Sequence, residues 1–247
     1  MNIRSINGGY LHNPPHPQVI SHCLLLQEDG HSALIDTGIG LLDIRQGRIA
    51  PDIARARGFQ FVEANTVAAQ LAAGEPAVNP DHLILTHADP DHAGGVSDFP
   101  GAVVHMSTEE YKALASGHYR YIPAQFSDDV RWELYSEGTD TWFGLEARRL
   151  RLPFASAVFL IPLFGHTEGH CGVAIETDEG WILQAGDAIF LEAELLTNDH
   201  PVSALSAGAA TDNKRRLRSL DVLRRLHREQ PHIRILTYHD PTGWKLP

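Results

Sequence analysis

One short stretch, LTHADPDHAGG at residues 85–95, constrains this chain more than any other. It places His87, Asp89, Asp91 and His92 within six residues and follows them with two glycines. Imidazole nitrogens and carboxylate oxygens packed this closely compete for water or repel one another unless a cation lies between them. The stretch therefore predicts a metal site, and the alternative is a polar turn that caps a helix.

Other candidate ligands also stand at the ends of short apolar runs that are typical of strands. His87 follows the run 82–86, His166 follows 157–163, and Asp187 follows 181–186. His239 lies near the end of the run 234–241. Side chains at strand ends converge at one edge of a sheet, where sites in layered folds are usually built. We therefore expect these residues to meet.

The remaining pattern predicts more strands than helices. Residues 19–26 and 32–35 read as a β-hairpin, 171–177 and 181–186 as a second one, and 102–106 as another strand. Three helices are predicted: 65–73 with Asn65 as a cap, one that Ser107 opens with a capping box to Glu110, and 212–228 with Asp212 as a cap. The last carries Leu217, Leu220, Leu223 and Leu226 along one stripe.

Residues 117–150 show no clear period and are interpreted as an insertion or loop region. Strands mixed with helices predict an α/β layered domain, and we expect one domain over residues 1–247. Pocket walls are expected from residues 40–62 and 117–150. His12 and His16 frame the stiff segment NPPHP, which is a candidate cover for the site.

The charge and apolar content of the chain indicate which kinds of partner it can bind. Acidic residues outnumber basic ones 31 to 20, a net charge of −11, which disfavours nucleic acid because a binder needs cations for the phosphates. No run approaches the roughly 18 apolar residues of a membrane span, and the N-terminus lacks a signal-peptide pattern. The two cysteines, Cys23 and Cys171, are expected to be buried free thiols. We expect a cytoplasmic protein with a small-molecule substrate, as a monomer or a homodimer.

Four segments together resemble the metallo-β-lactamase superfamily: HADPDH at 87–92, GHTEGH at 165–170, AGD at 185–187 and YHD at 238–240. Their order and spacing are similar to those of single-domain hydrolases in that group. The resemblance implies an αββα sandwich, with two mixed β-sheets face to face and helices on the outer faces.

The resemblance also implies a ligand set for two divalent metal ions, with zinc expected. His87 and His166 would bind the first ion, Asp91, His92 and His239 the second, and Asp187 would bridge them. Asp91 and Asp187 are the residues assigned a catalytic role, and a metal-bound hydroxide would be the nucleophile.

Two residues depart from the pattern. Asp89 stands where the family has a second histidine; it is either a ligand, or a carboxylate that supports the ligands from behind or is solvated. As a ligand it would add negative charge, weaken the Lewis acid and favour iron or manganese. Phe190 stands about where lactonases of the family carry a tyrosine, which lowers the expectation of lactone opening of that type. Asp36 and His170 are candidates for orienting the ligands, with simple structural roles as the alternative.

The leading hypothesis is a metal-dependent hydrolase of a small-molecule ester, lactone or related acyl bond. The alternatives are an iron-dependent redox enzyme of the same fold, acting on oxygen, nitric oxide or a sulfur compound, and a catalytically weak metal-binding protein. The arginine-rich helix 212–228 is expected to present a solvated basic face, with a docking site for an anionic partner as the alternative.

Overall fold

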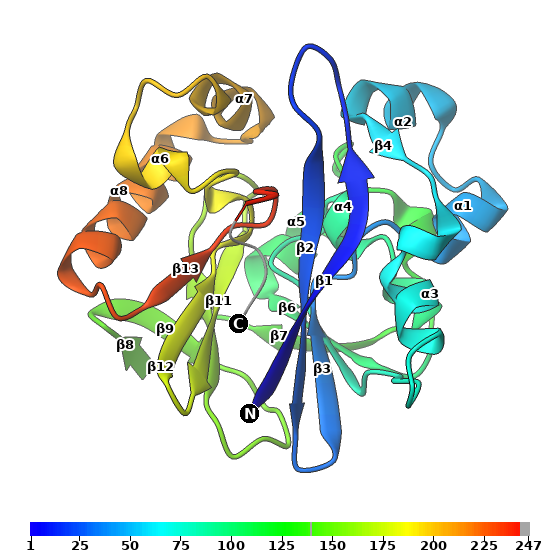
Figure 1. Ribbon diagram of the computed structural model, residues 1–247, viewed down its shortest axis with the longest axis horizontal. Helices are drawn as coiled ribbons and strands as arrows, with labels where there is room; N and C mark the ends of the chain where they lie inside the picture. Colours follow the sequence, from blue (N-terminus) through cyan, green and yellow to red (C-terminus); the bar gives the residue numbers. More distant parts are fainter. Residues whose placement is uncertain (139, 243–247) are drawn as a thin grey trace.

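Two β-sheets lie face to face with helices on their outer faces (Figure 1), as expected for an αββα sandwich. The computed structural model describes residues 1–138 and 140–242, so residues 139 and 243–247 of the predicted domain lie outside the described part.

Within the described residues, the first sheet has the strand order β4-β1-β2-β3-β5-β6-β7 and the second has the order β13-β12-β11-β10-β9-β8. The first sheet contains β1 (Asn2–Leu11), β2 (Val19–Glu28), β3 (His31–Ile35), β4 (Phe59–Gln60), β5 (His82–Ile84), β6 (Val103–Ser107) and β7 (Arg131–Tyr135). The second contains β8 (Asp140–Trp142), β9 (Leu145–Arg149), β10 (Val158–Pro162), β11 (Cys171–Thr177), β12 (Gly180–Gln184) and β13 (Arg234–Leu236). Both sheets are mixed: β3, β5, β6 and β7 run parallel, as do β12 and β13, and the other pairs are antiparallel.

The layers follow from the two-residue period of the strands. In β2, Leu24 and Leu26 pack between the sheets, together with Val173 and Ile175 of β11. Leu25, between them in sequence, packs on the opposite side of its sheet. A central strand with both faces covered is apolar on both faces, which explains the unbroken hydrophobic run that begins at Cys23.

Helices close the two outer faces. The helices are α1 (Leu41–Gln46), α2 (Pro51–Arg57), α3 (Val67–Ala72), α4 (Pro90–Ala93), α5 (Thr108–Ala115), α6 (Ala193–Leu196), α7 (Val202–Ala209) and α8 (Asn213–Glu229). Val67 and Leu71 of α3 pack on the first sheet, and Leu220, Leu223 and Leu226 of α8 pack on the second. None of the helices in the described residues has the length and apolar character needed to cross a bilayer.

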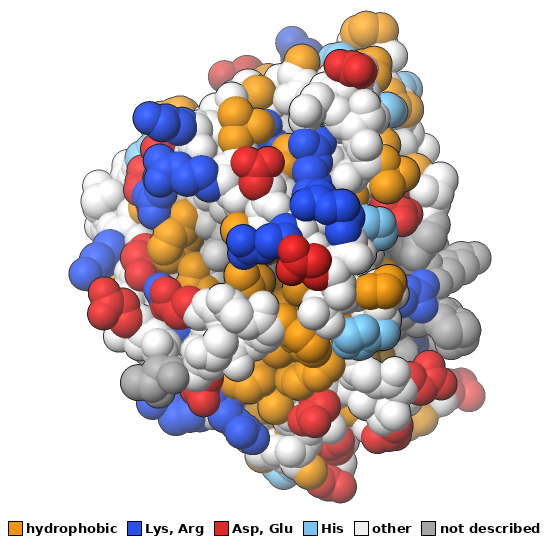
Figure 2. Space-filling view, turned by 90° about the vertical axis from the view of Figure 1, so that its left-hand side faces the viewer, with side chains coloured by type: hydrophobic (Ala, Val, Ile, Leu, Met, Phe, Trp, Pro, Cys, Tyr) orange, Lys and Arg blue, Asp and Glu red, His pale blue; other side chains and the backbone are white. Residues whose placement is uncertain are grey.

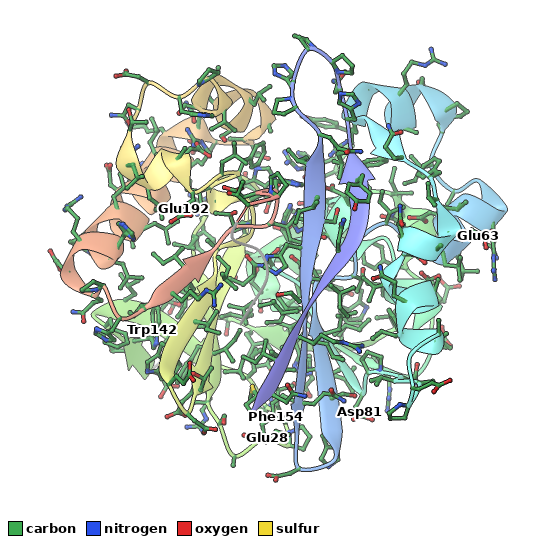
Figure 3. The ribbon with its side chains drawn as sticks, viewed as in Figure 1. Glu28, Glu63, Asp81, Trp142, Phe154 and Glu192 are labelled. Atoms are coloured by element: carbon green, nitrogen blue, oxygen red, sulfur yellow. The ribbon has the colours of Figure 1, made fainter. Side chains whose placement is uncertain are left out.

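Several predicted elements are confirmed. Both hairpins form, Asp212 caps α8 by accepting from the backbone nitrogen of Arg215, and both cysteines are buried free thiols. Glu28 at the hairpin end of β2 (Figure 3) accepts a hydrogen bond from Ser156 Oγ at 2.6 Å, which ties β2 to the loop that precedes β10.

Other predictions are wrong. Thr66, not Asn65, caps α3, because its Oγ1 accepts from the nitrogen of Ala69. Leu217 is 42% exposed and lies off the buried stripe of α8. Residues 117–150 are not a featureless insertion, since they supply β7, β8 and β9. The closing strand is shorter than predicted and ends at Leu236.

The basic helix is only partly a solvated face. Figure 2 shows Lys and Arg side chains mixed with acidic and apolar ones on this side of the molecule. Arg216 is buried and lies 3.5 Å from the Glu194 carboxylate. Arg224 donates to the backbone oxygens of Glu194 and Thr197 at the end of α6. These two arginines therefore fix α8 to α6.

Candidate metal centre

All seven predicted ligands lie together, in the loops where the strands end. They form two groups, one of His87, Asp89, His166 and Asp187, and one of Asp91, His92 and His239, and the ligand atoms of each group lie within 4.8 Å of one another. His87 and Asp89 follow β5, Asp91 and His92 belong to the short helix α4, and the others follow β10, β12 and β13. All seven side chains are buried.

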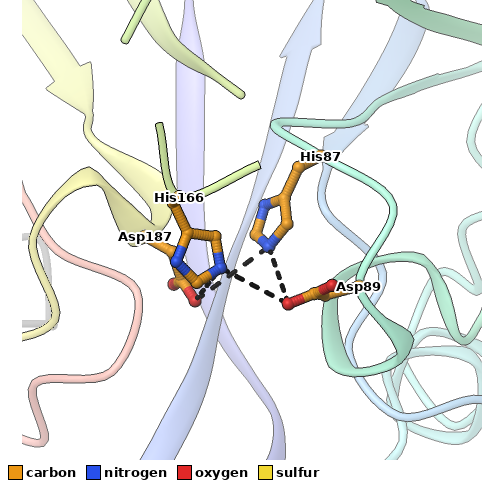
Figure 4. Close-up of side chains that lie close together, drawn as sticks. All are labelled: His87, Asp89, His166 and Asp187. Carbon is orange, nitrogen blue, oxygen red and sulfur yellow. Dashed lines mark hydrogen bonds and ion pairs between the residues drawn. The ribbon is translucent and has the colours of Figure 1, made fainter. Parts of the chain in front are cut away.

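The first group has the dimensions of a metal cage (Figure 4). His166 Nε2 lies 3.3 Å from Asp89 Oδ2 and 3.3 Å from Asp187 Oδ2. His87 Nε2 lies 3.5 Å from Asp89 Oδ2 and 4.0 Å from Asp187 Oδ2. Ligand atoms about 2.0–2.2 Å from a tetrahedral zinc ion are roughly 3.3–3.6 Å apart. The Asp89 side chain therefore reaches the position of a ligand in this group.

The second group shares the Asp187 carboxylate with the first. Asp187 Oδ1 lies 3.2 Å from His92 Nε2 and 3.3 Å from His239 Nε2. Asp91 Oδ2 lies 3.9 Å and 3.7 Å from the same two nitrogens. One oxygen of Asp187 faces each group, which is the arrangement of a bridging carboxylate.

Buried polar atoms without partners support the fit to cations. His87 Nε2, His92 Nε2 and Asp187 Oδ1 are buried and have no hydrogen-bond partner among the described residues. Burial opposes the charged form of Asp187, yet His239, His92 and His166 hold the pKa of its carboxyl well below the usual range. A cluster of imidazoles and carboxylates suits zinc, iron or manganese. The residues present thus fit divalent metal ions.

Hydrogen bonds on the far side of the rings aim the Nε2 atoms at the centre. His92 Nδ1 donates to Asp36 Oδ2 at 2.9 Å, and His239 Nδ1 donates to the Ile20 oxygen at 2.9 Å. His87 Nδ1 donates to Thr86 Oγ1 at 3.0 Å, whose hydroxyl donates in turn to Asp36 at 2.8 Å. Asp36 therefore has the contacts expected of an orienting residue, because each bond fixes a tautomer and a ring plane.

His170 fixes the backbone at Asp187. Its Nδ1 donates to the Leu163 oxygen at 3.1 Å, so its Nε2 is left to accept from the backbone nitrogen of Asp187 at 2.9 Å. Burial lowers the pKa of His170 to about 3, which keeps the ring neutral and its Nε2 an acceptor.

Glu110 joins the two ligand loops, a role that the sequence did not reveal. Ser107 Oγ accepts from the Glu110 nitrogen, as the predicted cap requires, but the Glu110 carboxylate does not return to Ser107. It accepts from Ala88 N at 3.0 Å, Tyr121 Oη at 2.9 Å, Thr167 Oγ1 at 2.6 Å and Gly169 N at 3.0 Å. Glu110 was predicted to complete a capping box, but its carboxylate instead forms a buried hydrogen-bonded link between the two ligand loops.

Arg120 is the second residue that sequence reasoning missed. Its Nε donates to Asp89 Oδ1 at 2.5 Å and its Nη2 to Asp89 Oδ2 at 2.7 Å. Burial alone would raise the pKa of Asp89, but the Arg120 guanidinium holds it well below the usual range. Arg120 stands in the region read as irregular, and no motif marks it.

The two groups open into a cavity of about 440 Å³. Beyond the candidate ligands and Arg120, its walls are mainly apolar and include Leu11, Val19, Phe59, Leu191, Val202 and Leu205. The expected wall segments contribute Arg57, Phe59 and Arg120, and His16 of the NPPHP segment lines the cavity as well. Phe190 also lines the cavity, where the resemblance places a residue near the substrate, whereas the stretch 200–209 was not expected there. The Phe190 ring centroid lies 5.1 Å from that of His239.

Comparisons with known proteins agree with this architecture. A probable metallo-hydrolase of Mycobacterium tuberculosis (strain ATCC 25618 / H37Rv) is 27% identical over 244 residues, covering 92% of this chain and 77% of the relative, and one from Mycobacterium bovis matches equally. An N-acyl homoserine lactone hydrolase, solved with the product N-hexanoyl-L-homoserine at its catalytic metal center, superposes with a TM-score of 0.72 at 20% identity, covering 97% of this chain and 93% of that one. A probable metal-dependent hydrolase from Staphylococcus aureus gives 0.69 at 17% identity, with coverages of 97% and 89%.

The family profile described as the metallo-beta-lactamase superfamily matches residues 16–227, which include every candidate ligand except His239. This match spans most of the sequence, and the sandwich and the placement of the ligand-type residues agree with it. The chain therefore belongs to the metallo-beta-lactamase superfamily.

Proposed function

We propose that this metallo-hydrolase opens an ester, lactone or related acyl bond in a small molecule that has a sizeable apolar part. The observation that carries the proposal is the direct opening of the candidate metal centre into a cavity of about 440 Å³ with mainly apolar walls. Such a cavity favours a ligand whose reactive group meets the polar floor while its apolar part displaces water from the walls.

The chain's own residues would hold and orient the reacting parts. His87, Asp89 and His166 would hold one divalent ion, Asp91, His92 and His239 would hold another, and Asp187 would be shared between them. When bound, such ions lower the pKa of a coordinated water and polarise a carbonyl oxygen. Asp91 and Asp187 are proposed as the catalytic carboxylates, because their oxygens face both the ligand histidines and the cavity. Zinc is the ion that we propose first, with iron or manganese as alternatives.

The lactone hydrolase among the structural neighbours makes a lactone a candidate substrate here. Phe190 sets a limit on that analogy, because its ring flanks His166 and His239 but has no hydroxyl with which to hold a substrate carbonyl. Arg57 and Arg120 line the same cavity, but Arg120 is paired with Asp89, so a substrate carbonyl would depend on the candidate ions for polarisation. We propose action on a small molecule in the cytoplasm, without a nucleic-acid or membrane partner, by a monomer or a homodimer.

The test is a hydrolysis panel of esters, lactones, thioesters and phosphodiesters with protein loaded with zinc, manganese or iron. We expect turnover of at least one carboxylic ester or lactone, rising with acyl-chain length until the cavity is filled. Asp187→Asn is the matched variant, and we expect it to lose activity because an amide bridges two cations poorly. Failure of all three metal forms on every acyl substrate would refute the proposal, and oxygen consumption by the iron form alone would favour the redox alternative.

A further inference from the structure

Arg120 is in direct contact with two candidate ligands of the first group. Its guanidinium forms a bidentate ion pair with Asp89 through Nε and Nη2. The Nη2 atom also lies 2.7 Å from His166 Nε2. On the other side its Nη1 donates to the Ala209 oxygen at 2.6 Å, at the end of α7. Arg120 is thus fixed in place rather than free to swing into the cavity.

The contact with His166 competes with metal binding. The ring nitrogen Nε2 has a single lone pair, which accepts either a hydrogen bond from Arg120 or a bond to a metal ion. The guanidinium also neutralises the Asp89 carboxylate, so this ligand attracts a divalent ion less strongly than an unpaired carboxylate would. Filling the first group therefore requires Arg120 to release His166 while it stays near Asp89.

The second group has no such competitor among the described residues. The Nε2 atoms of His92 and His239 face only carboxylate oxygens, those of Asp91 and Asp187, at 3.2–3.9 Å. No arginine or lysine forms an ion pair with Asp91 or Asp187 in the described part of the chain.

We propose that Arg120 makes the two metal subsites unequal: the subsite of Asp91, His92 and His239 fills first, and the subsite of His87, Asp89 and His166 is the weaker one. Arg120 acts as a positioning residue that turns Asp89 from a free carboxylate into half of an ion pair. Because Arg120 also holds Ala209, which lines the cavity, filling the weaker subsite is coupled to the wall formed by α7. The inference rests on metal binding, which is part of the proposed function.

The test is zinc binding to metal-free protein, followed by competition with chromophoric chelators of graded affinity. We expect two classes of site in the wild type, with dissociation constants at least about tenfold apart. In Arg120→Met the weaker class should tighten by about tenfold or more, because the charge that neutralises Asp89 and the competitor for His166 are both removed. Arg57→Met is the matched control: Arg57 Nη1 lies 3.6 Å from Asp89 Oδ2, and within the described residues no hydrogen bond joins it to His166, so a smaller change is expected.

Two further variants assign the classes and keep the test decisive. His166→Ala should remove the weaker class and His239→Ala the tighter one. If Arg120→Met does not fold, Arg120→Lys is the second variant. Lysine keeps the charge but cannot make the bidentate contact to Asp89 and reach His166 as well, so metal binding in the weaker class should still tighten. Equal classes in the wild type, or loss of the tighter class in His166→Ala, would overturn the inference. Protein that binds no zinc at all would refute the proposed function itself.

Discussion

The carboxylate of Glu110 offers a test of how the metal loops are held. It accepts four hydrogen bonds, two of them from the backbone nitrogens of Ala88 and Gly169, which stand beside the candidate ligands of the first group. In Glu110→Gln one oxygen becomes an NH2 group. The hydroxyls of Tyr121 and Thr167 can rotate to accept from it, but in either amide orientation one backbone N–H loses its acceptor.

An unsatisfied buried N–H costs about 1–3 kcal/mol. At roughly 2–4 °C per kcal/mol for a chain of this size, Glu110→Gln should lower the melting temperature of the metal-free protein by about 2–12 °C. Displaced loops should also weaken metal binding by about 10–100-fold, the usual effect of losing a support of this kind. Thermal unfolding followed by circular dichroism and chelator competition measure the two effects.

Glu63→Gln is the control, because Glu63 (Figure 3) forms an exposed, solvent-screened ion pair with Arg45 and its loss should leave the melting temperature nearly unchanged. Wild-type melting temperature and wild-type metal affinity in Glu110→Gln would refute the reasoning. A lower melting temperature with unchanged metal affinity would show that Glu110 stabilises the fold without positioning the ligands.

Three further predictions address other parts of the molecule. His170→Ala removes the acceptor for the Asp187 nitrogen, and chelator competition should show metal binding weakened by about 10–100-fold. Burial raises the pKa of Asp43 to about 6, so above that pH the fold holds a charge that it disfavours. Asp43→Asn should therefore stabilise the protein at pH 8, by up to about 3 kcal/mol, and the gain should vanish as pH falls through 6 towards 4, where the acid is protonated in the folded state. Equal melting-temperature differences at pH 8 and pH 4.5 would contradict this sign. Gly165 has φ +127° and a Cβ there would lie 2.0 Å from the backbone nitrogen of Arg216, so Gly165→Ala should displace His166 and lower the yield of folded protein; wild-type yield and metal content would count against that.

The features that could be predicted from the sequence are those whose signal is local. His87, Asp91 and His92 lie within six residues of one another, and the buried part of a strand such as residues 171–175 is a continuous apolar run. The cap of α8 likewise needs only Asp212 and the start of the helix. Such features are predicted correctly because the interactions that create them involve residues close together in the sequence.

The missed strands have the opposite character. β7 and β8 lie at the edges of their sheets, and β7 with β9 carries the charged runs RWELY and LEARR. Edge strands such as β7 tolerate and favour charge because one side is open to water, and β9, which lies next to the edge strand β8, likewise lacks the apolar run that identifies a central strand. β1 is interrupted by a bulge between Asn7 and Tyr10, at a pair of glycines that reads as a turn.

Asp89 shows why the electrostatics of the site could not be predicted. Taken alone, a carboxylate in place of a histidine adds a negative charge, from which a weaker Lewis acid and a preference for iron or manganese were expected. The structure places Arg120, 31 residues later in the sequence, in a bidentate ion pair with that carboxylate. The pair is neutral as a unit, like the histidine that it replaces, so the charge argument for iron or manganese loses its basis and only the preference of the oxygen donor remains. Arg120 reaches Asp89 because the segment after α5 folds back over the ligand loop, where Tyr121 binds Glu110. The effect of a charged residue in a ligand motif on the metal site therefore depends on the residue that it pairs with, and the tertiary fold determines which residue that is.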